Sequence, residues 1–446
     1  MMRRALPVLV AAAIAAGCGS ESSLPQATGK GTIRMINAMP ESPTVSFLIE
    51  ERTLDTVSYK NNSSPGRWDD LEYTFNFQIS RPSQVQPTRI ASQLLDVAPD
   101  VEHTFVLRGS IDAPGVDTWE IPERSFSENE TIFEMRVGHA ADSLGTVDVY
   151  IGQEGVPPQP GDEIATLAPG EVSTPRDIEE DDYVVTVTSA GDAGNVLFQS
   201  IPTQIVASQS VLITVLEGDA NDTAPVAVRI FNQEGSAATL ADSRFPPTAR
   251  FVHATTDLGT ADIYDDTGLQ NRIVADLAYG DITADIEVPA GEVPITATAA
   301  GNVGAILLED TLTAFNGTRV NYYLSKLAGD IVGEPIRVDR RSTETAARLT
   351  FFHSAANNRS VDLYVVDAGT AIDEALPRLA EQAYLQQTPP LALDAGSYDI
   401  YVTTSGEKTV LEGPLGLEAS YGDVFEAVLL DRVNPSLAEL KFFPPP

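Results

Sequence analysis

A phrase of the form His-x8-Asp-x-Tyr occurs three times in this chain of 446 residues. The copies begin at His139, His253 and His353, and a fourth position with equivalent spacing, at Asn37, has lost every side chain of the phrase. Successive starts are about 100 residues apart, which is the size of one small domain. The chain is therefore predicted to be a tandem array of four domains. A motif present in each repeat is expected to serve the fold of that repeat.

The phrase also raises the question of chemistry. A catalytic triad needs a nucleophile beside the base, and none recurs with these residues. A zinc site needs three or four ligands, and each repeat offers one histidine. The histidine is instead expected to cap a strand end and to bind the aspartate or a turn carbonyl, and a ligand-binding ridge built from these loops is the alternative. The phrase comprises His139, Asp148, Tyr150, His253, Asp262, Tyr264, His353, Asp362 and Tyr364.

Strand patterns fill the rest of each repeat. An apolar run such as Ile132–Val137 precedes the histidine, and an alternating run such as Val147–Ile151 follows the polar turn. Many short strands with frequent turn signals predict all-β, immunoglobulin-like sandwich domains. The only helix candidate is 371–386, and Pro377 interrupts it. The predicted divisions are a signal peptide at 1–17, a lipidated tether at 18–31, the divergent repeat 1 at 32–126, repeat 2 at 130–242, repeat 3 at 247–340 and repeat 4 at 345–446.

The N-terminus has the features of an export signal. Arg3 and Arg4 precede an alanine-rich apolar stretch, and small residues lead to Cys18, the only cysteine in the chain. This ending resembles a bacterial lipobox, although Ala15 stands where leucine is usual. The resemblance implies cleavage before Cys18 and a lipid on its thiol. Gly19 then favours the outer membrane over the inner one, and the side of that membrane is left open.

Acidic residues dominate the composition. The chain has 64 Asp and Glu against 28 Lys and Arg, a formal net charge of −36. Such a balance argues against nucleic acid as a partner, because phosphates need positive neutralisation. The acids are spread along the chain, as on a solvated surface that keeps an array soluble. The seams between repeats are polar or Pro-rich, and four domains placed end to end with stiff seams would reach on the order of 130 Å.

One acidic phrase suggests a metal. Asp219, Asn221 and Asp222 are similar to the calcium-binding linker phrase of cadherins, and their oxygens suit Ca²⁺. The phrase lies inside repeat 2, however, and the other ligand motifs of that family are missing. A polar hairpin is the competing interpretation. Weakly bound calcium is therefore the only cofactor for which the sequence offers a candidate.

The repeat as a whole resembles a known family. A strand ending in histidine, Asp-Val-Tyr at 148–150, Leu-Ala-Tyr-Gly at 277–280 and Asp-Ala-Gly-Ser-Tyr at 394–398 are similar to the bacterial domain-of-unknown-function family 4397. The resemblance extends from about residue 30 to the C-terminus and is poor in repeat 1. It implies an exported, tandem, immunoglobulin-like β-sandwich, and it brings no activity.

These observations favour a non-enzymatic lipoprotein of the cell envelope whose repeats act as a spacer or as a binding array. Its partners would be the outer membrane, through the lipid, and an unidentified protein or glycan. One alternative is an envelope hydrolase that acts on polysaccharide through paired carboxylates, although acids are too abundant to nominate a pair. The other alternative is a calcium-rigidified stalk. The leading hypothesis expects independent repeats without a shared cleft.

Overall fold

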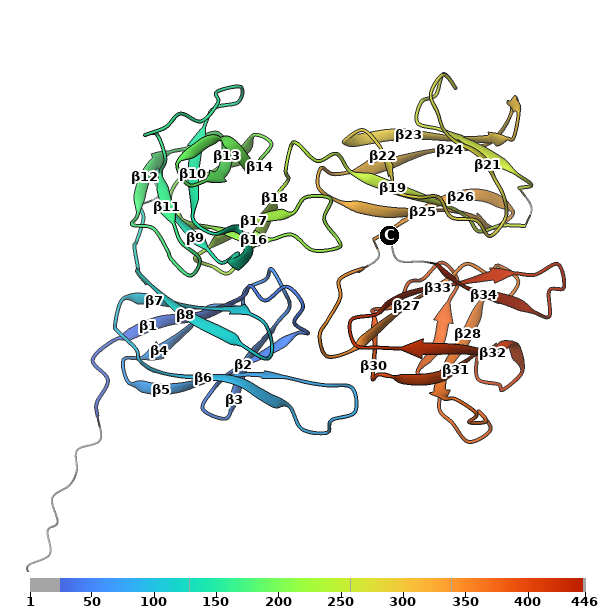
Figure 1. Cartoon of the computed structure of the whole chain (residues 1–446), viewed down its shortest axis with the longest axis horizontal. Coiled ribbons are helices and arrows are strands. Elements are labelled where there is room, and N and C mark those ends of the chain that lie inside the picture. Colours follow the sequence, from blue (N-terminus) through green and yellow to red (C-terminus); the bar gives the residue numbers. More distant parts are fainter. Residues whose placement is uncertain (1–24, 128, 257, 338, 444–446) are drawn as a thin grey trace, which may run out of the picture.

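The computed structural model describes residues 25–127, 129–256, 258–337 and 339–443. Within these ranges the chain is almost entirely β-strand, with one short 3-10 turn at Asp142–Leu144. Four β-sandwiches follow one another along the chain, so the all-β tandem fold predicted from the sequence is confirmed (Figure 1). The described part contains no helix long and apolar enough to span a bilayer. The expected signal peptide and Cys18 lie outside the described residues.

Each sandwich consists of two packed sheets with the same strand order. The opening strand pairs in parallel with the strand that comes second to last in the basic eight-strand unit, and all other pairings are antiparallel. In repeat 1 the first sheet has the order β4 (Gly66–Asp69), β1 (Lys30–Asn37), β7 (Val101–Gly109) and β8 (Pro114–Pro122), and the second has β3 (Arg52–Val57), β2 (Val45–Ile49), β5 (Glu72–Ile79) and β6 (Thr88–Asp96).

Repeat 2 extends this plan with one additional strand in each sheet. Its first sheet has the order β12 (Arg176–Glu179), β9 (Ile132–His139), β16 (Ser210–Glu217), β17 (Val226–Asn232) and β18 (Ala237–Leu240). Its second sheet has β11 (Ala165–Leu167), β10 (Val147–Gly152), β13 (Asp181–Ser189) and β14 (Asp192–Gln199), with β15 (Thr203–Ile205) also paired to β13.

Repeats 3 and 4 return to four strands in each sheet. In repeat 3 the sheets are β22 (Ile286–Glu287), β19 (Thr248–His253), β25 (Arg319–Leu327), β26 (Asp330–Ile336), and β21 (Arg272–Leu277), β20 (Ala261–Tyr264), β23 (Gly291–Ala299), β24 (Asn302–Ala314). In repeat 4 they are β30 (Leu391–Leu393), β27 (Ala347–His353), β33 (Val424–Asp431), β34 (Ala438–Phe443), and β29 (Leu379–Ala383), β28 (Ser360–Asp367), β31 (Gly396–Thr404), β32 (Val410–Ala419).

The helix expected at 371–386 is wrong. This segment forms turns followed by the strand β29, which pairs with β28. Pro377 cannot donate a backbone hydrogen bond inside a helix, and the residue before a proline avoids the helical region. The short stretch beyond it gains more from completing the sheet than a single helical turn would supply.

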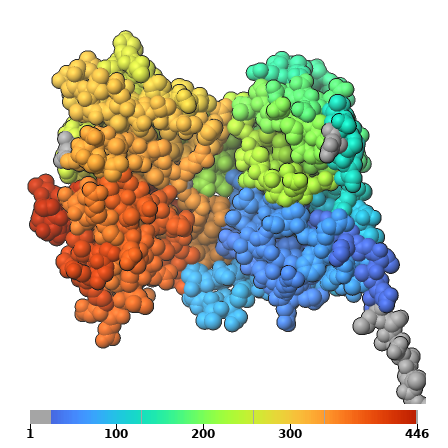
Figure 2. All heavy atoms as spheres, turned by 180° about the vertical axis from the view of Figure 1, so that it is seen from behind, coloured from blue at the N-terminus to red at the C-terminus, as the bar shows by residue number. Residues whose placement is uncertain are grey.

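The four repeats are not strung end to end. Repeat 1 packs against repeat 2, repeat 3 packs against repeat 4, and the two pairs lie side by side in a block (Figure 1). The space-filling view from behind shows the same arrangement, with all four repeats in one compact body (Figure 2). The expectation of independent repeats is therefore wrong, because apolar cores are shared between repeats. The seam at 339–345 is also largely buried, including Arg340, Arg341 and Thr345.

Strands with two buried faces explain the pairing of repeats. Val211, Ile213 and Val215 of β16 point into the core of repeat 2, whereas Leu212 and Leu216 point into a second core shared with repeat 1. A strand with only one buried face would alternate apolar and polar residues. Strand β33 repeats the pattern, because Ala427 and Leu429 belong to the core of repeat 4 and Val428 and Leu430 to the core shared with repeat 3.

Candidate functional site: signature residues and the junctions between repeats

The three signature histidines occupy the same place in their repeats. Each ends the first strand, is fully buried, and lies with Nε2 close to a carbonyl oxygen of the following turn. The partners are Gly145 at 2.7 Å from His139, Gly259 at 2.5 Å from His253 and Asn358 at 2.6 Å from His353. The histidine thus fixes the turn that leads into the second strand. The turn carbonyl was one of the two partners expected from the sequence.

The bonds of the ring define its protonation state. In His139 and His353, Nδ1 accepts the backbone N–H of the residue two positions later, Ala141 or Ala355. The carbonyl at Nε2 requires a proton on that nitrogen, so the ring is neutral with its proton on Nε2. Burial disfavours the charged form and lowers the pKa of all three histidines, for His353 to about 4.

This lowered pKa predicts an acid-sensitive repeat 4. The unfolded chain binds a proton at His353 near pH 6.5, whereas the folded chain resists it until about pH 4. Stability contributed by the neutral ring is complete above pH 6.5 and falls as the pH drops toward 4, by about 2 kcal/mol at pH 5. Hydrogen exchange of the amides in β27 measures it. The advantage of the wild type over His353→Asn should shrink between pH 7 and 5, and parallel pH profiles would contradict the assignment.

Repeat 1 uses Asn37 where the others use histidine. The side-chain oxygen of Asn37 accepts the backbone N–H of Met39 at 3.1 Å, the bond that Nδ1 accepts in repeats 2 and 4. The amide nitrogen donates to the carbonyl of Val57 at 3.1 Å and to Ser42. The side-chain oxygen of Asn37 thus takes the place of the histidine Nδ1 as acceptor, and its amide nitrogen binds a turn of a different shape. The divergent residue therefore keeps the structural role of the signature.

The signature aspartates hold a different turn. One oxygen of each accepts the backbone N–H of a glycine that follows the third strand of its sheet: Gly191 for Asp148 (2.7 Å), Gly301 for Asp262 (3.0 Å) and Gly406 for Asp362 (2.9 Å). These glycines have φ between 70° and 77°, which residues with a Cβ rarely adopt. The other oxygen binds the neighbouring strand, through Thr166, the amide of Asp276 and the amide of Glu381 respectively.

This geometry makes Asp362→Asn a sensitive substitution. Both carboxylate oxygens accept backbone N–H groups, so an amide nitrogen at either position leaves one donor unpaired. The expected loss is about 1–3 kcal/mol of stability in repeat 4. Faster hydrogen exchange at the amide of Gly406 would report it. Asp367→Asn, at the exposed end of the same strand, serves as the control and should change little.

No catalytic constellation forms from the signature. The histidine binds the turn after the first strand, and the aspartate binds the turn after the third, so the two side chains serve separate loops. Tyr150, Tyr264 and Tyr364 are buried, so their rings pack inside the protein and are not available to a ligand at the surface. Among the described residues, no group of three His, Cys, Asp or Glu side chains is placed to hold a metal ion.

Repeats 1 and 2 join through an apolar core with polar contacts around it. Trp119 of β8 is buried and donates its indole N–H to the carbonyl of Gly170 at 2.7 Å. Its ring lies against Gly138 so closely that a Cβ there would be 2.3 Å from the ring. Arg34, buried beside Glu102 at 2.6 Å, donates to the carbonyl of Asn232 across the interface. The apolar members are Ile36, Ala38, Val106, Trp119, Ile121, Ala140, Leu212, Leu216, Ala227 and Phe231.

Repeats 3 and 4 join through a related interface. Tyr279 of repeat 3 donates its hydroxyl to the carbonyl of Asp431, and Tyr384 of repeat 4 donates to the carbonyl of Lys326. Lys326 and Asp431 occupy equivalent positions, each two residues after the residue that pairs with the signature histidine of its own repeat. Each repeat therefore donates a tyrosine hydroxyl to the same position of the other repeat. Repeats 3 and 4 thus contact each other through equivalent surfaces, as the two subunits of a two-fold symmetric homodimer do.

The same tyrosine bond recurs between repeats 1 and 2. Tyr59 donates to the carbonyl of Glu217 at 2.7 Å, and Glu217 is the counterpart of Asp431. These tyrosines belong to the small turn phrase at 58–59, 277–280 and 382–386, whose role between repeats the sequence reasoning missed. The sequence did contain a signal for this role. A tyrosine in a turn lies away from the core of its own repeat, so its ring and hydroxyl are expected to contact another part of the chain.

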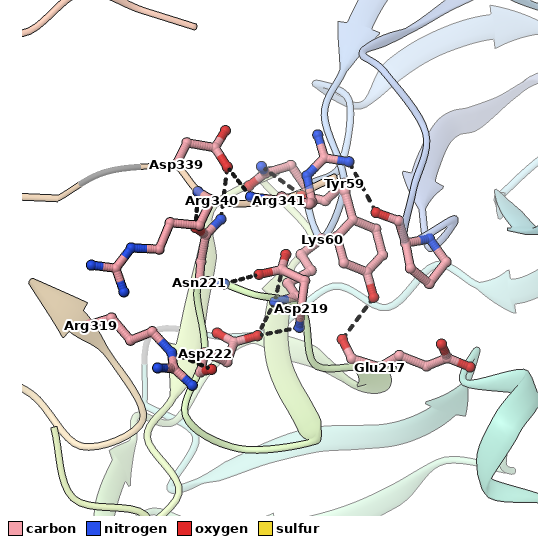
Figure 3. Close-up of polar contacts among 12 residues, drawn as sticks. Tyr59, Lys60, Glu217, Asp219, Asn221, Asp222, Arg319, Asp339, Arg340 and Arg341 are labelled. Carbon is pink, nitrogen blue, oxygen red and sulfur yellow. Dashed lines mark hydrogen bonds and ion pairs between the residues drawn. The ribbon is translucent and has the colours of Figure 1, made fainter. Parts of the chain in front are cut away.

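A polar cluster joins repeat 1, repeat 2 and the seam after repeat 3 (Figure 3). Lys60 of repeat 1 pairs with Asp219, at 3.1 Å, and with Asp222 of repeat 2. Asn221 between them donates to Asp339 at 2.9 Å and accepts the backbone N–H of Arg340 at 2.7 Å, both from the seam after repeat 3. The calcium candidate of repeat 2 thus contacts both repeat 1 and the seam after repeat 3.

The adjoining seam binds back to repeat 1. Arg341 donates to the carbonyls of Pro40 at 3.0 Å and Ser42 at 2.5 Å, and Glu344 accepts the backbone N–H of Ile111 at 3.1 Å. These contacts link the beginning of the chain to the entrance of repeat 4. The contacts between the two pairs of repeats are therefore hydrogen bonds, whereas repeats 1 and 2 share an apolar core together with the ion pairs of Lys60.

The calcium candidate is placed in a polar hairpin. Asp219, Asn221 and Asp222 lie in the loop between the antiparallel strands β16 and β17. An ammonium group already lies between the two carboxylates, and Asn221 uses both ends of its amide within the protein. These contacts are those of an ion-pair cluster, and calcium binding stays a prediction.

Comparison with known proteins agrees with the repeat architecture. The family model described as "Domain of unknown function (DUF4397)" matches residues 31–150 and 247–364, together more than half of the chain. Each match begins at the first repeat of a pair and runs into the second strand of its partner. No curated protein matches the chain.

Among solved structures, one match is the Bacillus anthracis TIE protein, with 10% identity and a TM-score of 0.15, covering 91% of this chain and 69% of that one. With that TM-score the likeness carries no argument about fold or function. The family match does carry one, since it spans both pairs and coincides with the tandem sandwiches described above. The chain therefore belongs to the domain-of-unknown-function family DUF4397.

Proposed function

We propose that this chain is a non-enzymatic binding module of the cell envelope in which four sandwiches form one rigid block. The observation that carries the proposal is the burial of the surfaces between repeats, with an apolar core inside each pair and a polar cluster between the pairs. A flexible spacer needs none of these contacts. A rigid block instead presents loops from several repeats in fixed relative positions, which favours binding.

The signature residues support the same assignment. The polar atoms of the histidines and aspartates form hydrogen bonds with turns of their own repeat, so the recurring motif stabilises the fold of each repeat. Recognition would then depend on surfaces that differ between repeats or lie between them. A protein or a glycan of the envelope is the class of partner proposed, and the acidic surface disfavours nucleic acid.

Anchoring at the outer membrane through a lipid on Cys18 is part of this proposal. The lone cysteine follows an apolar, alanine-rich segment and small residues. Growth with radiolabelled palmitate should label the wild type and leave Cys18→Ser unlabelled and released from the membrane fraction. Equal labelling of the two, or a membrane-free wild type, would contradict lipidation.

The binding role is tested with the purified block and isolated envelopes. The chain produced without residues 1–17, with Cys18→Ser, should bind envelopes saturably and release no product from envelope polysaccharide. Protease treatment of intact cells, followed by detection of the C-terminal repeat, tells which side of the membrane to search. Turnover abolished by a single Asp or Glu substitution, without saturable binding, would contradict the proposal and favour the hydrolase.

A further inference from the structure

A cavity of about 610 Å³ lies where repeat 2 meets repeat 3. We name it the junction pocket; Ile201, Thr239, Phe315, Asn316, Arg319 and Arg337 are among the residues that line it. Its volume is within the range of small-ligand sites. None of its lining residues belongs to the His-x8-Asp-x-Tyr signature, so the fold of a single repeat does not account for it.

The walls of the junction pocket are fixed by contacts between the repeats. Thr223 donates its backbone N–H to the carbonyl of Gly317 at 2.9 Å, and Arg319 donates to the carbonyl of Asp222 at 3.1 Å. Four of the lining residues appear together in Figure 3: Asn221, Asp222, Arg319 and Asp339. Because these groups already bind one another, the pocket exists without a ligand, and a ligand need not order it.

Apolar groups are unusually exposed at this place. Phe315 is 51% exposed and Ile201 is 41% exposed, although both are large hydrophobic side chains. The guanidinium of Arg337 lies 5.5 Å from the centre of the Phe315 ring. Hydroxyl and amide groups of Thr239, Asn316 and other residues stand around this apolar wall. The pocket thus combines a stacking surface with hydrogen-bonding groups.

The charges around the pocket are nearly balanced. Asp222 is paired with Lys60, Asp339 with Arg348, and Arg319 with Asp285. Within the described residues, no carboxylate lies within 4.0 Å of the Arg337 guanidinium, which leaves its N–H groups available as donors. The whole chain carries a formal charge of −36, which repels polyanions at long range. The acidic chain disfavours a polyanion, and among the described lining residues the one guanidinium without a carboxylate partner offers hydrogen-bond donors to a ligand that carries no large charge.

We propose that the junction pocket binds a neutral oligosaccharide of two or three sugar units. Sugar rings present C–H faces that pack on Phe315 and Ile201, and hydroxyls that pair with Arg337, Asn316 and the threonines. A neutral ligand suits the balanced charges and is not repelled by the acidic surface. This inference rests on the proposed binding function and names its ligand class.

Calorimetry with the unacylated chain tests the proposal, using neutral trisaccharides built from glucose, mannose and N-acetylglucosamine. At least one should bind, and Phe315→Ala should weaken it about tenfold or more. Tyr421→Ala is the matched control, since Tyr421 is also an exposed aromatic, at 48%, and lies away from the pocket. It should leave the affinity unchanged. Salt should have little effect, because the ligand is uncharged.

Three results would overturn the proposal. One is the absence of binding by every neutral trisaccharide, and another is equal binding by the wild type and Phe315→Ala. The third is binding of only trigalacturonate or an apolar tripeptide, which would assign the pocket to acidic sugars or to peptide ends. If Phe315→Ala still binds envelopes saturably while no saccharide binds, the junction pocket assignment fails and the proposed binding function stands.

Discussion

Trp119→Ala is expected to separate repeats 1 and 2 and to cost about 3–5 kcal/mol of stability. The side chain is 2% exposed, fills the core shared by the two repeats and donates to the carbonyl of Gly170. Its removal leaves a cavity and an unpaired carbonyl between the repeats. Denaturant unfolding measures the loss of stability, and small-angle scattering should show a larger radius of gyration.

Trp68→Ala is the matched control, since Trp68 packs against the core of repeat 1, against Tyr73 and beneath Arg52. It should lower the stability of repeat 1 without enlarging the particle. Gly138→Ala tests the same interface from the other side, because its Cβ would overlap the ring of Trp119. An unchanged radius for both Trp119→Ala and Gly138→Ala would mean that the pairing does not depend on this core.

Lys60→Met should cost a comparable 3–5 kcal/mol, roughly, because it leaves Asp219 and Asp222 charged and without their cation. The side chain of Lys60 is only 11% exposed, so water does not replace the lost partner. Methionine keeps most of the apolar stem, which separates the effect of charge from that of packing. Thermal unfolding at neutral pH should show a clear fall in Tm.

The pH dependence of this variant has a definite sign. Burial raises the pKa of Asp222 even beside Lys60, and removing the cation should raise it further. A carboxyl whose pKa is raised on folding destabilises the folded state at neutral pH, and this cost decreases as the pH falls and the carboxyl takes up a proton. The difference in stability between the wild type and Lys60→Met should therefore become smaller toward pH 4.5. Lys30→Met removes an exposed ion pair with Asp69 and should cost less than about 1 kcal/mol. Equal effects of Lys30→Met and Lys60→Met would contradict the central role of the cluster.

Much of the fold within each repeat could be predicted from the sequence. The apolar runs before the histidines and the alternating runs after them are the strands β9, β10 and their counterparts. These patterns could be recognised because side chains alternate between the two faces of a strand, so a buried face appears in the sequence as every second residue being apolar. The turn carbonyl as a partner of His139 followed from the same reasoning, since a buried imidazole needs a hydrogen bond.

The pairing of repeats could not be predicted in the same way. Leu212 and Val428 are apolar in the sequence, but the pattern does not say whether they face a core of their own repeat or another repeat. Lys60 and Asp219 are separated by more than a whole repeat, and their meeting depends on the packing of entire domains. Arg340 and Arg341 belong to a polar seam that would be exposed in an open array and is buried in a closed block.

The most direct test of the closed block is small-angle scattering of the chain produced without residues 1–17 and with Cys18→Ser. A compact body of this length is expected to have a radius of gyration of about 22–25 Å. Four domains in a row, on the order of 130 Å long, would give about 38 Å. A value near the first would support the rigid four-repeat module, and a value near the second would contradict it.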